Sequence, residues 1–395
     1  MEGAVVIGGH VQGLGIVRML GSKKIPVVLM DVTGYNVARF SKYCSKFIKM
    51  PADIFESEQK FCDFLKEKSQ QYNLQDWLLF PTDDQTVAYI SRNKGELSDY
   101  YTVWTPAWDV VEQCYNKKLT YSLAKKTGVP YPHTCSVEDI QELHDIAAGL
   151  CYPVIVKPAV RHKFSEATHA QFYVAENREE LLDYYKLALE VISSDEILIQ
   201  EMIPCRVEDN VEVGVFFCQG KISKSVTIKK IRQIPMKGGT GTSYQIIPDN
   251  PLLLGYCKDL LESINYYGIC DLEFIWDQRD KTYKVIDINP RTFKWHYLSG
   301  FVGYSLPYQL YCDIYRLNPE SCCHKRTNDS IKYFDEILDC SIAWYEIMKG
   351  RLKVRDYVQS IKGSRRYAVA SWNDPLPFIV GTIIAPRVFW NRRVI

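Results

Sequence analysis

The sequence lacks several features that mark whole classes of protein. Its formal net charge is only +1, so bulk electrostatics give no support to nucleic-acid binding. Its 13 cysteines include no C-x-x-C pair, which argues against a zinc site and favours reduced thiols in the cytoplasm. No window reaches the roughly 18 apolar residues that a membrane span needs. The start, MEGAVVIGG, reads as a first strand rather than as a signal peptide. We therefore expect a cytoplasmic protein with no nucleic-acid partner.

The nearest approach to a membrane segment is the C-terminal stretch PFIVGTIIAPRVFWNRRVI. It is interrupted by Pro386 and ends in Arg387, Arg392 and Arg393. We expect a final packed segment with a solvated basic end, and peripheral contact with an anionic membrane surface is the alternative.

A chain of 395 residues predicts two or three packed units. Residues 4–31 read as strand, glycine loop, helix and strand, and the second strand closes on Asp31. A helical pattern at 56–73, a strand at 76–80 and the polar turn PTDDQT follow. This alternation predicts a parallel sheet whose ligands gather at the carboxyl ends of its strands. We assign residues 1–110 to a Rossmann-like domain.

The remainder has a different pattern. Residues 111–310 combine helices with largely antiparallel hairpins, so the fold class is α/β followed by α+β. Helical patches without a clear independent core predict that 311–395 is a helical extension packed on the preceding domain.

Polar residues alternate along the strand-like segment YKVIDINPRTF. Strand side chains alternate between faces, so Asp287, Asn289 and Arg291 point the same way. If the preceding strand pairs with this one, Glu273 faces Asp287 across the hairpin. Two carboxylates and an amide oxygen suit Mg²⁺ that also holds substrate phosphates. A polar strand end on an exposed face is the structural alternative.

Nucleotide-binding candidates lie on other elements. Lys117 opens a helix and Lys157 ends an apolar strand, so the two lysines could clamp one phosphate chain. Glu201 ends the strand ILIQE and could read an adenine amino group, with the Ile203 amide facing a ring nitrogen. Glu208 could hold ribose hydroxyls, with Asp209 as the alternative.

The segment GGHVQGLG suggests a dinucleotide-binding loop, with Asp31 suited to a ribose hydroxyl. Its spacing is not G-x-G-x-x-G, and a glycine loop before a helix can bind any anion. A substrate site on this domain is therefore favoured over a nicotinamide site.

The order of these motifs resembles the ATP-grasp superfamily of carboxylate–amine ligases over residues 1–310. NKKLTYSLAKKTGVPYP is similar to the family's first lysine segment, which makes Lys117 the phosphate lysine, and VIVKPA to its second, which carries Lys157. LIQEMIP is similar to the adenine-contacting strand, so Glu201, Met202 and Ile203 are implied nucleotide contacts. The resemblance divides 111–310 into a lysine-bearing part, 111–200, and a metal-binding part, 201–310.

The metal hairpin of the family resembles DLEFIWD and YKVIDINPR, which implies Glu273, Asp287 and Asn289 as ligands, with Asp287 where glutamate is usual. KKIRQIPMKGGTGTSY resembles the predicted carboligase group that includes the D-aspartate ligases. By that resemblance Lys230, Arg232 and Arg291 are catalytic.

One departure concerns the segment that would cover the phosphates. AVRHKFSEATHAQ lacks the family's glycines, and Arg161, His162 and Lys163 would supply charge instead.

The resemblance implies an ATP-dependent ligase that uses Mg²⁺, with Mn²⁺ as an alternative. It would join a small-molecule carboxylate to an amine through an acyl phosphate, with an amino acid and a cell-envelope or polysaccharide precursor as substrates. A nicotinamide-dependent oxidoreductase and a non-catalytic nucleotide-binding module are the competing hypotheses, and the oligomeric state is open.

Overall fold

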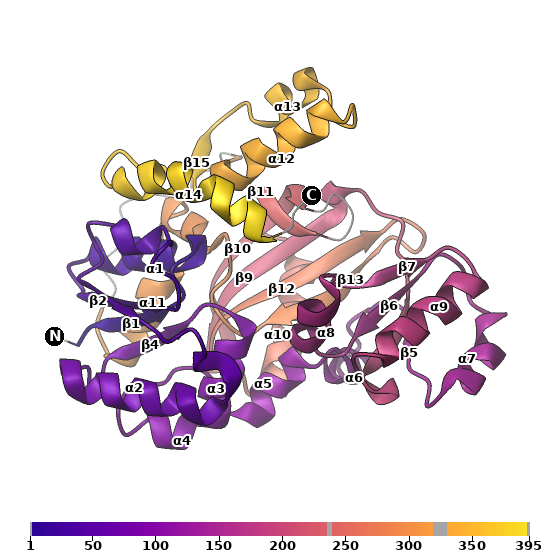
Figure 1. Ribbon diagram of the computed structural model, residues 1–395, viewed down its shortest axis with the longest axis horizontal. Coiled ribbons are helices and arrows are strands. Elements are labelled where there is room, and N and C mark those ends of the chain that lie inside the picture. Colours follow the sequence, from indigo (N-terminus) through magenta and orange to yellow (C-terminus); the bar gives the residue numbers. More distant parts are fainter. Residues whose placement is uncertain (1, 235–238, 319–329, 393–395) are drawn as a thin grey trace.

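The computed structural model describes residues 2–234, 239–318 and 330–392, and describes side chains as far as residue 385. Three sheets lie side by side, with the N-terminal unit in indigo, the lysine-bearing unit in magenta and the largest sheet between them (Figure 1). The C-terminal helices lie over one end of the largest sheet.

The N-terminal sheet is parallel throughout, in the order β3-β2-β1-β4, as the alternating pattern predicts. Its strands are β1 (Ala4–Ile7), β2 (Val27–Asp31), β3 (Lys46–Lys49) and β4 (Leu78–Pro81). Its helices are α1 (Val11–Gly21), α2 (Glu58–Tyr72), α3 (Asp84–Arg92), α4 (Lys94–Leu97) and α5 (Trp108–Tyr115). The apolar runs of β1, β2 and β4 are buried on both faces, as in other parallel sheets.

The lysine-bearing sheet is antiparallel, in the order β5-β8-β6-β7. Its strands are β5 (Thr134–Cys135), β6 (Val154–Pro158), β7 (Tyr173–Ala175) and β8 (Ile197–Glu201). Its helices are α6 (Lys117–Thr127), α7 (Ile140–Ala147), α8 (Arg161–Thr168) and α9 (Arg178–Leu189). Helix α6 ends at Gly128, whose φ of +73° is the left-handed conformation that glycine adopts without strain.

Helix α8 replaces the covering loop that the sequence predicts after Lys157. The segment has no glycine and contains arginine, lysine, glutamate and alanine, all good helix formers. The helix brings Arg161 to the cavity described below, whereas His162 pairs with Glu166 on the outer surface.

The largest sheet has the order β13-β12-β9-β10-β11-β14-β15. Its strands are β9 (Asn210–Cys218), β10 (Lys221–Ile234), β11 (Thr240–Ile247), β12 (Gly268–Asp277), β13 (Thr282–Asn289), β14 (Lys332–Phe334) and β15 (Arg365–Tyr367). Helices α10 (Pro251–Ser263) and α11 (Leu306–Ile314) pack on it. Short 3₁₀ turns occur at Ala38–Phe40, Ile54–Glu56, Ser194–Glu196, Val207–Asp209 and His296–Phe301.

The C-terminal segment contains the expected helices α12 (Glu336–Met348), α13 (Val354–Ser360) and α14 (Leu376–Arg392). It also adds β14 and β15 to the edge of the largest sheet, which a purely helical extension would not do. Each of these strands is three residues long, too short for an alternating pattern to be recognised.

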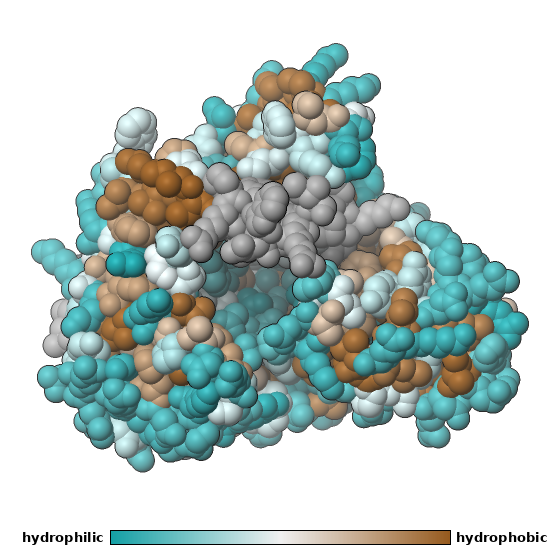
Figure 2. All heavy atoms as spheres, viewed as in Figure 1, coloured by the Kyte–Doolittle hydropathy of each residue, from teal (hydrophilic) through white to brown (hydrophobic). Residues whose placement is uncertain are grey.

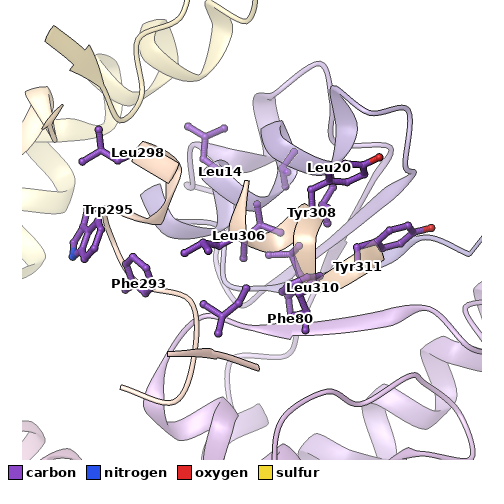
Figure 3. Packing of buried hydrophobic residues seen from close by; sticks show 14 of the residues in the cluster. Leu14, Leu20, Phe80, Phe293, Trp295, Leu298, Leu306, Tyr308, Leu310 and Tyr311 are labelled. Atoms are coloured by element: carbon purple, nitrogen blue, oxygen red, sulfur yellow. The ribbon is translucent and has the colours of Figure 1, made fainter. Parts of the chain in front are cut away.

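A hydrophobic cluster joins the N-terminal sheet to the segment that follows β13 (Figure 3). Phe293, Trp295 and Leu306 come from that segment, and Leu14 and Phe80 come from the N-terminal unit. All five are at most 3% exposed. This packing fixes the end of the predicted metal hairpin against the N-terminal unit.

Candidate active site

A cavity of about 490 Å³ opens between the three sheets. The hollow at the centre of the face in Figure 2 lies between the N-terminal and lysine-bearing units. The glycine loop contributes His10, Val11 and Gln12 to its wall. Of the residues predicted from the sequence, the cavity is lined by Lys117, Lys157, Glu201, Met202, Ile203, Lys230, Glu273, Asp287, Asn289 and Arg291.

The hairpin of β12 and β13 has the register that the sequence analysis assumed. Glu273 pairs with Asp287 and Asp271 pairs with Asn289. The Asn289 side-chain amide lies 3.2 Å from Glu273 Oε1 and donates to it. The expectation that Glu273 and Asp287 face each other across a hairpin is thus confirmed.

Glu273 also belongs to a cluster of three carboxylates. Oxygens of Glu212, Asp271 and Glu273 lie within 4.8 Å of one another, and the Lys230 ammonium is 3.0 Å from Glu212 and 2.9 Å from Glu273. Burial alone would raise the pKa of Glu273, but Lys230 outweighs it and holds the pKa at about 2. Burial raises the pKa of Asp271 well above its usual value, and the neighbouring carboxylates add to this.

The Asp287 carboxylate is held by two cations from the lysine-bearing unit. Lys117 Nζ lies 2.7 Å from its Oδ1, and Arg161 donates to its Oδ2 over 3.2 Å. The side chains of Lys117 and Asp287 are only 12% and 13% exposed, so solvent screens this attraction weakly. A predicted phosphate lysine and a predicted metal ligand are therefore neighbours.

Lys157 is a buried lysine with two neutral partners. Its ammonium lies 2.7 Å from the Tyr121 hydroxyl and 2.8 Å from Gln200 Oε1. Burial lowers the pKa of Lys157 well below its usual value, and the nearby Lys117 lowers it further. An anionic ligand in the cavity would oppose both effects, which suits this lysine to a phosphate.

The carboxylate of Glu201 is shared among several donors. It accepts from the His133 amide over 2.9 Å, and it pairs with Arg279 at 2.6 Å and Lys284 at 3.0 Å. Burial would raise the pKa of Glu201, but these donors hold it below its usual value. The side chain is thus fixed at the end of β8, beside Met202 and Ile203 in the cavity wall.

Arg291 connects the hairpin of β12 and β13 to the N-terminal unit. Its Nε donates to Asp84 Oδ1 over 2.6 Å, and its Nη2 donates to Asn289 Oδ1 over 3.1 Å. Burial would lower the pKa of Arg291, but Asp84 more than offsets this and raises it. Asp84 lies in the turn PTDDQT, which the sequence analysis placed at a ligand-binding sheet edge.

Two residues with predicted catalytic or ribose-binding roles, Arg232 and Glu208, are not among the described residues that line the cavity. Arg232 is buried in an ion pair with Asp339, with N–O distances of 3.0 and 2.6 Å. The register of β10 shifts between Lys230 and Arg232, so strand alternation does not carry Arg232 to the cavity side with Lys230. Glu208 is exposed, and its neighbour Asp209 is buried against Arg206.

Many cavity residues were not predicted from the sequence, and four of them, Glu212, Asp271, Gln200 and Trp295, contact predicted site residues or one another. Glu212 and Asp271 could have been found by strand alternation, because Asp271 lies two positions before Glu273 and Glu212 is the one acid in VEVGV. Gln200 and Trp295 gave no signal, because their roles depend on contacts between distant segments. Trp295 donates its indole N–H to Glu212.

Known proteins are similar to this chain in the region that builds the cavity. Residues 116–309 match the family described as the carbamoyl-phosphate synthase L chain, ATP binding domain. D-aspartate ligase of Enterococcus faecium is 24% identical over 233 residues, 57% of this chain and 54% of that relative. The C-terminal section of the carbamoyl phosphate synthase large chain of Methanopyrus kandleri is 24% identical over 190 residues, 46% of this chain and 34% of that relative. The chain thus spans about half of the first relative's length and a third of the second's.

Solved structures are similar over more of the chain. The biotin carboxylase domain of the Hydrogenobacter thermophilus 2-oxoglutarate carboxylase, solved with MgADP, ADP and bicarbonate, has a TM-score of 0.65 at 16% identity, covering 84% of this chain and 73% of that one. The L-amino acid ligase of Bacillus licheniformis has a TM-score of 0.59 at 14% identity, covering 79% and 73%. The family match and these structures agree that the chain has the ATP-grasp fold, and the resemblance predicted from its motifs is confirmed.

Proposed function

We propose that this protein is an ATP-dependent ligase that joins a carboxylate to an amine and releases ADP and phosphate. The observation that carries the proposal is that Lys117 and Lys157 line the same cavity as Glu273, Asp287 and Asn289. Phosphoryl transfer needs this combination of cations and hard oxygen ligands, since it depends on positioning and charge stabilisation.

Glu273, Asp287 and Asn289 fit a hard divalent cation such as Mg²⁺, with Mn²⁺ as an alternative. The buried Asp271 Oδ1 beside them has no hydrogen-bond partner among the described residues, and a nearby cation would compensate it. When bound, the metal would neutralise phosphate charge. Without a cation, the Asn289 oxygen accepts from Arg291 and its amide nitrogen donates to Glu273, so ligation would require the side-chain amide to turn its oxygen toward the carboxylates.

The chain's own residues position the reacting groups. Lys157 would hold a phosphate, with its ammonium oriented by Tyr121 and Gln200. A substrate carboxylate oxygen would form a bond to the γ-phosphorus as the bond to ADP breaks. The amine nitrogen then attacks the acyl carbon, phosphate leaves, and the amine proton passes to solvent. Lys230 and Arg291 also line the cavity, and we propose that they stabilise the negative charge that develops on the transferred groups.

The two substrates belong to the same proposal. We propose an amino acid as one substrate, which the similarity to D-aspartate ligase supports, and a cell-envelope or polysaccharide precursor as the other. A cytoplasmic location is consistent with ATP as substrate and with the free thiols of the described cysteines. No helix in the described parts of the chain is long and apolar enough to cross a membrane.

The oxidoreductase hypothesis has less support. Asp31, its candidate ribose ligand, accepts from the Gly9 amide over 2.5 Å and from the Thr33 amide over 2.8 Å. Asp31 is also not among the described residues that line the cavity, so it does not meet the other candidate residues in one site.

The test is an ADP-release assay with Mg²⁺ and ATP, run over a matrix of amino acids and carboxylates with product masses recorded. We expect ADP release that depends on one acid and one amine, and a product lighter than their sum by one water. Glu273→Gln should abolish turnover, whereas Asp259→Asn on the exposed face of α10 should leave it unchanged. ATP binding without turnover under every pair would favour the non-catalytic module.

A further inference from the structure

The surface of the C-terminal segment is unusual for its exposed apolar side chains. Fourteen large hydrophobic residues are exposed in the described chain, and nine of them lie between positions 344 and 383. These nine are Trp344, Met348, Val354, Val358, Tyr367, Trp372, Leu376, Ile379 and Ile383. Figure 2 shows brown surface over α14 and again around α12 and α13. Such a concentration marks an interaction surface rather than scattered exposure.

The spacing of these residues indicates that each of the three helices carries an apolar stripe. Trp344 and Met348 are four residues apart on α12, and Val354 and Val358 are four apart on α13. On α14, Leu376, Ile379 and Ile383 follow at intervals of three and four. Residues at these spacings lie on one side of a helix, so each helix presents an apolar stripe to solvent.

Helix α14 is held in place on its other side, so its exposed stripe is a fixed feature. Phe378 and Ile384 pack against the main hydrophobic cluster, and Gly381 lies against Ile337. Asp374, just before the helix, forms a buried ion pair with Arg18 of α1 at 2.9 Å. The helix is thus apolar on both its buried and its outer side.

The same segment is strongly basic. Residues 349–366 contain seven lysines and arginines and one acid, Asp356, in a chain whose net charge is only +1. Six of the seven are exposed: Lys349, Arg351, Lys353, Arg355, Lys362 and Arg365. Arg351 is paired with Glu346, and the other five have no described ion-pair partner.

We propose that this face, formed by α12, α13 and the outer side of α14, docks on the surface of an anionic lipid bilayer. Apolar stripes with exposed tryptophan, flanked by lysine and arginine, have the chemistry of an interfacial membrane contact. A second copy of the chain fits less well, because a symmetric contact would bring two sets of like charges together. The side chains of Arg387, Arg392 and Arg393 lie outside those described.

The test is co-sedimentation of the full-length protein with lipid vesicles. The vesicles are phosphatidylcholine alone, or phosphatidylcholine with about 30% phosphatidylserine. We expect binding to the anionic vesicles only, weakened severalfold when salt rises from about 0.1 M to about 0.5 M. The triple variant Trp372→Ser/Ile379→Ser/Ile383→Ser should bind about tenfold more weakly or worse. Lys353→Glu/Arg355→Glu should have a similar effect.

A matched control is Leu187→Ser/Leu189→Ser/Leu252→Ser, which removes three exposed leucines from α9 and α10 and should bind as the wild type does. Circular dichroism checks that each variant is folded. No sedimentation with anionic vesicles at low salt, or equal binding by both triple variants, overturns the proposal. A concentration-dependent dimer that the C-terminal triple variant abolishes, without lipid binding, would instead assign the face to a second copy.

Discussion

Lys117 Nζ and Asp287 Oδ1 lie 2.7 Å apart, which joins the first turn of α6 to the edge strand β13. With Arg161 on the other carboxylate oxygen, two cations from the lysine-bearing unit balance one carboxylate of the metal hairpin. A divalent cation bound to Asp287 would supply the same positive charge as Lys117 and Arg161 and would leave these two cations available to a phosphate. The proposed site therefore positions phosphate-binding and metal-binding groups within reach of one ligand.

Removing the Asp287 carboxylate tests this arrangement. Asp287→Ala should lower Mg²⁺-dependent ADP formation about a hundredfold or more, because a metal oxygen ligand is lost and two cations lose their counter-charge. The measurement is steady-state ADP release over a range of Mg²⁺ concentrations. Asp259→Ala, an exposed aspartate on α10, is the control. Wild-type turnover in Asp287→Ala would rule out a metal role for this residue.

Lys157 provides a test of nucleotide binding. Lys157→Ala should weaken ATP binding about tenfold or more, because a charge-assisted contact to phosphate is lost. Titration calorimetry with ATP and Mg²⁺ measures the change in Kd. Lys163→Ala should have no effect, since Lys163 is exposed on α8 and is not among the described cavity residues. An equal loss in both variants would mean that α8 covers the phosphates as the sequence-based interpretation assumed.

The alternation of strands and helices predicted the parallel sheet, and side-chain periodicity predicted the hairpin of β12 and β13, whose strands are long enough to reveal an alternating pattern. Strand β13 has eight residues and β12 has ten, so alternation places Glu273 and Asp287 on one face. The three-residue strands β14 and β15 carry no such signal. Strand β14 joins the largest sheet through a distant segment, as in the pairing of Tyr244 with Tyr333, and β15 joins it only by pairing with β14.

The candidate site was predictable where residues able to bind a metal or a phosphate also fall on the same face of a strand. Asn289 and Arg291 follow alternation and reach the cavity. Arg232 does not, because a bulge in β10 breaks the alternation after Lys230, and local sequence does not reveal a bulge. Trp295 also required the tertiary structure, since its indole reaches Glu212 only through the packing around Phe293.

That packing makes a prediction about Gly214 on β9. A Cβ at this position would lie 2.2 Å from the Phe293 ring and 2.9 Å from the Trp295 ring. Gly214→Ala should therefore lower the free energy of unfolding by about 1–3 kcal/mol, because the rings must move within a packed core. Gly255→Ala in α10, where a Cβ meets no atom within 4 Å, should raise it by about 0.5–1 kcal/mol. Urea unfolding measures both, and a tolerated Gly214→Ala would mean that the rings can shift.

His296 should make stability depend on pH. Its ring is fully buried, Nδ1 lies 2.6 Å from the Phe293 carbonyl oxygen, and Nε2 has no hydrogen-bond partner among the described residues. Burial lowers the pKa of His296 to about 4, although the Phe293 carbonyl partly opposes it. Between about pH 6.5 and pH 4 the unfolded chain binds a proton that the folded chain does not, so stability falls as pH falls, by up to about 3 kcal/mol.

Urea unfolding of wild type and His296→Leu over this pH range measures the effect of the imidazole, because the carboxylates that titrate below pH 5 are common to both proteins. The free energy of unfolding of the wild type should decline more steeply on acidification than that of His296→Leu, whatever their difference at neutral pH. His162→Leu, which removes an exposed imidazole from α8, should keep the wild-type slope. Parallel curves for wild type and His296→Leu would mean that the buried ring accepts a proton in the folded state as readily as in the unfolded one.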